Sequence, residues 1–263
     1  MLAAVQNGDV KKLAELIRQD PGFDVNMSQD GFRRTLLHFA CLAGDNRSHM
    51  IPLLLAHPDI DVNLKDMGGY TPFCLACYAG CTSCVRELLK DSRVKVNEPR
   101  TDGYPPLWWA AWHGHLDIIK WWIVSGREMD FGKPGDIYKT DAIGGAKKEG
   151  KKEVVNLLEI FQSDSTQTRH SVRVELGLLD EVADEVFALM VFVSDGLLQI
   201  RDTASSSPAA RFFNIARRLP LELQMVLCHR VVGSVKEIIP GKESEVAFKS
   251  LAKSLLWASF FTD

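Results

Sequence analysis

The sequence predicts an all-α protein, in which a solenoid of five helix-turn-helix repeats with hairpin loops precedes a small C-terminal helical domain. The first observation is a glycine that recurs every 34 to 36 residues, each time four residues after an alanine. A fixed period in this range indicates stacked units, because one unit cannot bury its apolar face alone. The second observation is that this repetition stops near residue 160, although apolar residues keep a helical spacing beyond it. The pairs are Ala4 and Gly8, Ala40 and Gly44, Ala76 and Gly80, Ala110 and Gly114, and Ala146 and Gly150.

Each unit is expected to open with a short inner helix that carries the alanine. Proline is tolerated in the first turn of a helix, the small alanine lets two helices approach, and the glycine reverses the chain. The three clearest openings are Thr35 to Ala40 (Thr-Leu-Leu-His-Phe-Ala), Thr71 to Ala76 (Thr-Pro-Phe-Cys-Leu-Ala) and Pro105 to Ala110 (Pro-Pro-Leu-Trp-Trp-Ala). They resemble the Thr-Pro-Leu-His-x-Ala motif of ankyrin repeats. The resemblance covers residues 1 to about 164 and implies protein binding rather than catalysis.

A second, outer helix follows in each unit, since Leu13, Leu16 and Ile17 have apolar counterparts at the same helical spacing in later units. Turn residues between units, such as Asp102-Gly103, predict hairpin loops. Three places depart from the ankyrin pattern. Arg33 replaces the expected turn glycine, residues 45–52 are longer than their counterparts, and residues 141–146 keep only the shape of the motif. In the aromatic fourth unit, Trp109, Trp121 and Trp122 are expected on interior positions.

Composition narrows the class of protein. The 263 residues, 46% of them hydrophobic, can form a sizeable core. A net charge of −3 provides no basic stripe for nucleic acid. The longest apolar run, Val186 to Val193, falls short of the roughly 20 residues that span a bilayer. Met1 lies directly before the first helix, so no leader is expected. We therefore expect a cytoplasmic protein, with the nucleus left open, and six reduced cysteines.

Cys74, Cys77, Cys81 and Cys84 have spacings close to those of zinc or iron–sulfur sites. However, their repeat positions correspond to packed positions in other units, which suit small buried thiols. We expect packing and no metal. His38 fills the ankyrin histidine position, where its ring can bond to the next hairpin. No nucleotide, metal-protease or esterase motif occurs, so neither a cofactor nor an enzyme activity is expected.

The polar stretch from Gln162 to Arg169 is expected to be a hinge between a solenoid of residues 1–164 and a helical domain of residues 165–263. That domain should contain helices over residues 178–200, 212–219, 220–231 and 246–256. The segment Leu219-Pro220-Leu221-Glu222-Leu223 is faintly similar to an F-box. This similarity implies an adaptor that recruits a ubiquitin-ligase core. The alternative is an ordinary helix opened by proline.

The ankyrin resemblance also nominates a contact surface, because hairpin tips and the exposed turns of inner helices line one concave face. Aromatic residues and arginine dominate these positions, and they are the types that anchor interfaces. We expect a monomer that binds a protein partner there. An alternative for Trp112 is that it folds over the neighbouring helix. Lysines 147, 148, 151 and 152 suit a solvated cap rather than an anion site. The nominated residues are Arg34, Tyr70, Tyr78, Tyr104, Trp112, His113 and Tyr138.

Overall fold

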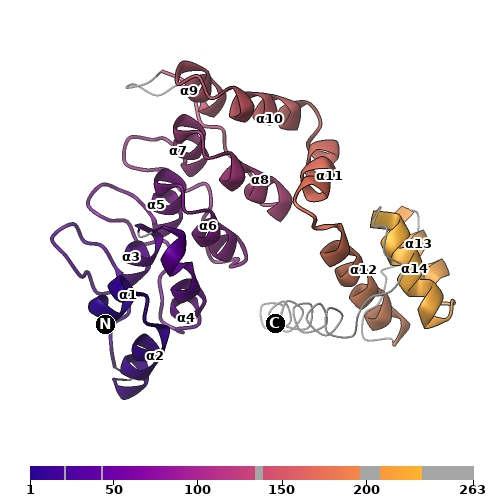
Figure 1. The fold of residues 1–263 in the computed structure, drawn as a ribbon, viewed down its shortest axis with the longest axis horizontal. Helices are drawn as coiled ribbons and strands as arrows, with labels where there is room; N and C mark the ends of the chain where they lie inside the picture. Colours follow the sequence, from indigo (N-terminus) through magenta and orange to yellow (C-terminus); the bar gives the residue numbers. More distant parts are fainter. Residues whose placement is uncertain (21, 43, 134–138, 196–207, 233–263) are drawn as a thin grey trace, which may run out of the picture. The chain divides into compact units, whose positions relative to one another are not determined.

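The computed structural model describes residues 1–20, 22–42, 44–133, 139–195 and 208–232 (Figure 1). The chain divides into two compact units, Met1–Val172 and Arg173–Asp263. Within the described ranges the regular elements are helices and no strand occurs. The predicted all-α repeat fold is therefore confirmed.

The first unit contains two layers of helices. The inner helices pack on one another in chain order, and each outer helix follows its inner helix. In Figure 1 the loops between repeats extend from the inner layer on the side away from the outer helices. The inner helices are α1 (Leu2–Asn7), α3 (Leu36–Leu42), α5 (Pro72–Ala79), α7 (Pro106–His113) and α9 (Ala142–Lys148). The outer helices are α2 (Val10–Gln19), α4 (Ile51–Leu55), α6 (Thr82–Leu89), α8 (Leu116–Ser125) and α10 (Lys152–Ser163).

Helix α5 shows why the repeated hexapeptide forms an inner helix. The Thr71 hydroxyl accepts a hydrogen bond from the Cys74 amide at 3.1 Å, and Pro72 follows in the first turn. Both features stabilise a helix start, because the first amides of a helix lack partners within it. Gly80 ends the helix with φ of 79°, in the left-handed region that favours glycine.

The outer helix of the second repeat is broken. A 3₁₀ segment, η1 (Asp45–Met50), precedes α4, which has Pro52 in its first turn. The extra length expected at residues 45–52 thus lies in a separate 3₁₀ segment that precedes the short α-helix.

The core of the solenoid is aliphatic at its start and aromatic in the fourth repeat. Trp108 and Trp122 are fully buried, and the Trp122 ring meets the edge of Phe73 with ring centroids 5.0 Å apart. The expectation of interior positions holds for Trp109 and Trp122. It is wrong for Trp121, which is half-buried and lies under the Arg86 guanidinium at 3.9 Å.

Helix α11 (Ser165–Glu175) begins inside the stretch expected to be a hinge, so most of that stretch is helical. Gln162 and Ser163 complete α10, and the Asp164 carboxylate accepts a hydrogen bond from the Gln167 amide at 2.9 Å. A polar stretch can thus be helical when an aspartate caps it. Near its middle, Arg169 donates to the carbonyl of Ile123 at 2.9 Å.

In the second unit, α12 (Leu179–Ser194) packs against α13 (Pro208–Ala216) and α14 (Leu221–Val232). Its core contains Phe187, Met190, Ala216 and Cys228. The expected continuation of α12 from residue 196 to residue 200 and the helix expected at 246–256 lie outside the described residues. None of the helices in the described ranges has the length and apolar character needed to cross a membrane.

Candidate functional site

The loops that precede α3, α5 and α7 are tight turns closed by backbone hydrogen bonds. The amide of Asp66 donates to the carbonyl of Tyr70 at 3.0 Å, and Arg100 donates to Tyr104 at 3.1 Å. The residue two positions before the start of each later repeat motif has a positive φ, and these residues are Arg33 (59°), Gly69 (78°), Gly103 (82°) and Lys139 (55°). Arg33 therefore adopts the left-handed conformation of the glycine that it replaces, at a cost that glycine avoids.

Side chains of the inner helices fix the loop of the next repeat. The buried His38 ring donates through Nε2 to the carbonyl of Tyr70 at 3.0 Å, and its Nδ1 accepts from the amide of Thr35 at 3.2 Å. Burial lowers the pKa of His38 despite the favourable hydrogen bond to Tyr70. The predicted structural role of His38 is confirmed. At the equivalent position of the fourth repeat, Trp108 Nε1 donates to the carbonyl of Thr140 at 3.2 Å.

Three asparagines in the segments that follow the outer helices join successive repeats, a role that was missed in the sequence. Asn26 donates to the carbonyl of Asp59 at 2.7 Å and accepts from the amide of Asp61 at 2.8 Å. Asn63 makes the same pair of bonds with the third repeat, and Asn97 accepts from the amide of Asp130 at 3.0 Å. The recurring Val-Asn dipeptide was the signal available.

Four side chains from the third and fourth repeats form an aromatic cluster, defined as Tyr70, Tyr78, Trp109 and His113. The Tyr78 ring centroid lies 5.4 Å from that of Tyr70, 5.5 Å from Trp109 and 4.9 Å from His113. Within the cluster Trp109 is buried, whereas Tyr78 and His113 are exposed. The cluster therefore contains one ring held in the core and two rings that another protein can reach.

Arg100, which was not nominated, organises one side of this aromatic cluster. Its guanidinium lies 4.5 Å from the Tyr70 ring centroid and 5.0 Å from that of Trp109. It also donates to the Tyr70 hydroxyl at 2.7 Å. Burial raises the pKa of Tyr70 to about 12, so the phenol stays protonated at neutral pH.

The Trp112 ring packs against the core on one side and is partly exposed. It stacks on the buried Trp108 with ring centroids 4.7 Å apart, and the Lys148 ammonium lies 5.7 Å from the centroid of the Trp112 ring. The side chain is half-buried. Both expectations for Trp112, packing and exposure, therefore describe part of its surface.

Arg34 lies in the turn before α3, between two loops. Its guanidinium is 3.7 Å from the Asp66 carboxylate and 4.9 Å from the Phe32 ring centroid. Phe32 is 60% exposed, and Met67 in the next loop is 64% exposed. The amide of Met67 donates to the carbonyl of Phe32 at 2.8 Å, which holds these two apolar tips together. Neither tip was nominated, although both are apolar residues beside turn glycines.

One nominated residue does not belong to this surface, and the structure does not describe another. Tyr104 is 1% exposed, with its ring centroid 4.4 Å from that of Trp108, so its expected exposure is wrong. Tyr138 lies outside the described residues.

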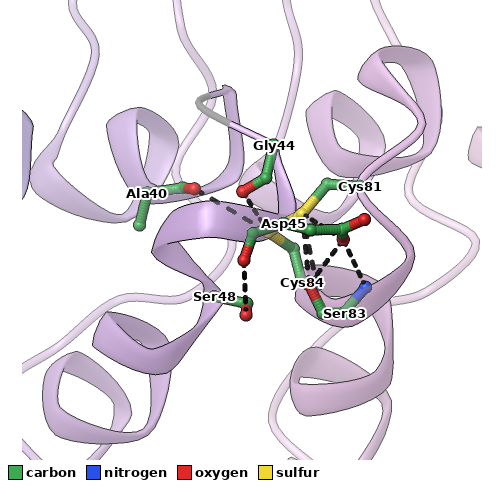
Figure 2. The surroundings of a disulfide bond; sticks show 7 residues. All are labelled: Ala40, Gly44, Asp45, Ser48, Cys81, Ser83 and Cys84. Carbon is green, nitrogen blue, oxygen red and sulfur yellow. Dashed lines mark hydrogen bonds between the residues drawn. A yellow bond between two sulfur atoms is a disulfide. The ribbon is translucent and has the colours of Figure 1, made fainter. Parts of the chain in front are cut away.

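The expectation of six reduced cysteines is corrected by a disulfide between Cys81 and Cys84 (Figure 2). Cys74 and Cys77 are buried thiols, as their packing positions predicted, and burial raises the pKa of Cys74 to about 12. Among the described residues, no three His, Cys, Asp or Glu side chains converge as metal ligands.

The two-layered stack of helix pairs and its exposed loop face define a repeat solenoid of the kind that presents a surface to other macromolecules. A family model described as ankyrin repeats (3 copies) matches residues 1–99 and 46–133. The chain belongs to the ankyrin-repeat family, which is a family of protein-interaction modules.

The chain is also similar to parts of three longer proteins. The chain is 39% identical over 92 residues to the SMC5-SMC6 complex localization factor protein 1 of Bos taurus and to that of Homo sapiens. These matches cover 35% of the chain and 8% of each relative. It is also 30% identical over 123 residues to a protein of Oryza sativa subsp. japonica named "Probable E3 ubiquitin-protein ligase XBOS32". That match covers 46% of the chain and 23% of the relative.

Proposed function

We propose that the chain is a non-catalytic module that binds a protein partner across the concave ankyrin face. The proposed contact surface contains Arg34, Tyr70, Tyr78, Trp112 and His113. The observation that carries this proposal is the exposed edge of Tyr78 and His113 above a buried Trp109. An aromatic residue held in place before binding loses little conformational entropy, and such residues often dominate interface energies.

The position of the contact surface can be tested without knowing the partner. A photo-crosslinking amino acid is placed in the full chain at Tyr78, at His113 or, as a control, at Trp121 on the outer helix α8. In cells of origin, we expect one protein species to crosslink from positions 78 and 113 but not from 121. Crosslinking only from 121, or from none of the three positions, would contradict the proposal.

Affinity for the crosslinked partner then tests the residues. Tyr78→Ala and Trp112→Ala are each expected to weaken binding by about 2 kcal/mol, as interface hot spots do. Trp121→Ala is the matched control, because Trp121 is also a half-buried tryptophan of the fourth repeat. Unfolding must be measured for all three variants. A loss of binding that only follows a loss of stability would exclude a direct contact.

A second candidate function is substrate adaptor for a ubiquitin ligase, through the segment faintly similar to an F-box. Leu221 and Leu223 are 50% and 51% exposed at the start of α14, which leaves apolar surface for a further protein. The printed name of the rice relative points in the same direction. Recovery of ligase scaffold proteins that is lost in Leu221→Ala/Leu223→Ala, but kept in Tyr78→Ala, would favour this candidate.

A further inference from the structure

The Cys81–Cys84 disulfide lies where two repeats meet. Cys81 is the residue before α6, and its sulfur accepts a hydrogen bond from the Cys84 amide at 3.3 Å. Asp45 of η1, in the preceding repeat, accepts hydrogen bonds from the Ser83 amide at 2.9 Å and the Ser83 hydroxyl at 2.5 Å. The disulfide therefore closes the helical turn through which the third repeat is attached to the second (Figure 2).

The surroundings of the two sulfurs suit the reduced pair as well. Cys81 Sγ lies 3.6 Å from the Asp45 carboxylate, and Cys84 Sγ lies 3.7 Å and 3.9 Å from the carbonyl oxygens of Ala40 and Gly44. A disulfide sulfur has no proton to donate. While the disulfide is intact, these oxygens therefore touch the sulfurs without accepting a hydrogen bond from them. Each thiol formed by reduction would find an acceptor in place. Reduction therefore leaves neither of these two thiols without a hydrogen-bond acceptor.

We propose that Cys81 and Cys84 are a reversible thiol–disulfide exchange site that controls how firmly the first turn of α6 is held against the second repeat. In the exchange, a thiolate of a small dithiol attacks one sulfur, the Cys81–Cys84 bond breaks, and a mixed disulfide forms. The second thiol of the reductant then displaces the cysteine. Two electrons and two protons are gained by the pair, and the reductant leaves as its own disulfide.

Burial makes this exchange dependent on local opening. Cys81 is 1% exposed and Cys84 is fully buried, so a reductant reaches neither sulfur in the closed structure. Opening the first turn of α6 must break both Asp45–Ser83 hydrogen bonds. The bond closes a ring of only a few residues, so its loss should loosen this turn without unfolding the solenoid.

The first experiment counts thiols in the full chain. The protein is held under native conditions with oxidised or reduced dithiothreitol, quenched with acid, denatured and alkylated. We expect four alkylated cysteines after oxidation and six after reduction, with peptide mapping placing the change at Cys81 and Cys84. Returning the reduced protein to oxidised dithiothreitol should restore four.

Two double variants provide controls. Cys81→Ala/Cys84→Ala should show the same thiol count under both conditions. Cys74→Ala/Cys77→Ala should keep the difference of two, because those thiols are free. Six thiols under both conditions, or four that resist native reduction, would overturn the proposal. So would a loss of helical circular dichroism on reduction.

Hydrogen exchange then tests the coupling between repeats. Reduction should speed amide exchange by about tenfold both in residues 81–89 and in residues 44–50, because Asp45 joins the two segments. In Asp45→Ala the thiol count should still change, native reduction should be faster, and the effect on exchange should be confined to residues 81–89. Unchanged exchange in wild-type α6 would show that the bond has no control over this turn.

Discussion

Single residues in the loops determine how closely successive repeats pack, and two turn glycines show this most directly. Gly69 and Gly103 occupy equivalent left-handed positions, but their surroundings differ. A methyl group on Gly69 would lie 2.5 Å from Thr101 Cγ2 and 2.8 Å from the Thr101 amide nitrogen, whereas on Gly103 it would meet nothing within 4 Å.

We predict that Gly69→Ala lowers the free energy of unfolding by about 3 kcal/mol and Gly103→Ala by about 1 kcal/mol. Alanine is strained in the left-handed conformation in both variants. Only Gly69→Ala adds a clash with Thr101 of the next loop. Urea unfolding of the two variants measures the difference directly. Equal losses would show that the loops separate easily.

His38 provides a test at acidic pH. Its folded-state pKa is lowered by burial, so the unfolded chain binds a proton more readily than the folded chain does. Stability should be complete above the unfolded value of about 6.5 and should fall as the pH drops below it. Protonation would also place a proton on Nδ1, where Thr35 now donates.

The expected result is that wild-type protein loses more stability between pH 7.5 and 5.5 than His38→Gln does, as measured by the urea midpoint at each pH. His170→Gln, which alters an exposed histidine on α11, is the control and should keep the wild-type slope. Parallel slopes for wild type and His38→Gln would contradict the assignment.

At the scale of the element, α8 depends on one buried tryptophan. Trp122 packs against Phe73 of the preceding repeat and donates through Nε1 to the carbonyl of Glu128 at 3.2 Å. We predict that Trp122→Ala costs about 3 to 5 kcal/mol, through lost burial and a cavity. Because repeats stabilise their neighbours, hydrogen exchange should increase in α6 and α10 as well.

Trp121→Ala is the control for this prediction. Trp121 is half-buried on the same helix, under Arg86, so its replacement by alanine should lower the free energy of unfolding by less. A urea midpoint for Trp122→Ala equal to that of Trp121→Ala would show that the aromatic contact with Phe73 contributes little.

The helices were predictable from sequence where a local rule determines them. The Ala–Gly period located each inner helix because a glycine must reverse the chain there, and Arg33 kept its register despite the missing glycine. The helicity of residues 165–169 was missed because it depends on the Asp164 cap rather than on periodicity. The broken outer helix of the second repeat appeared in the sequence only as extra length.

The candidate surface was less predictable, because exposure depends on which neighbour covers a side chain. Tyr70 and Tyr104 occupy equivalent positions, yet the Trp108 ring lies against Tyr104 and makes it part of the core. The spacing of the four cysteines between residues 74 and 84 was compatible with metal ligation, with packing as free thiols or with a disulfide bond. Arg100 could not be nominated, since its place over two rings requires the loop to be folded.

At the scale of the whole molecule, the first unit is expected to reach its full stability only when α11 is included. Thr168 and Val172 are buried, and Arg169 reaches the end of α8. We predict that residues 1–175 are more stable than residues 1–164 by about 2 kcal/mol, from this burial and the hydrogen bond.

Denaturant unfolding of both fragments, followed by circular dichroism, measures this difference. Arg169→Ala in the longer fragment should remove part of it. If the two fragments unfold at the same urea concentration, α11 adds nothing to the stability of the repeats.

The asparagines that join successive repeats bear on how such a chain can change length in evolution. Asn26 and Asn63 each bond the backbone of the following repeat at equivalent positions. The second repeat therefore both receives such bonds from the first repeat and makes them to the third. A duplication of one full period restores both sets of bonds in register, wherever its ends fall in the gene. An insertion of another length must be accommodated inside its own repeat, as in the second repeat, which contains the additional segment η1 and still keeps both pairs of bonds. Descendants of this chain should therefore change length either by whole periods or within an outer helix, away from these asparagines.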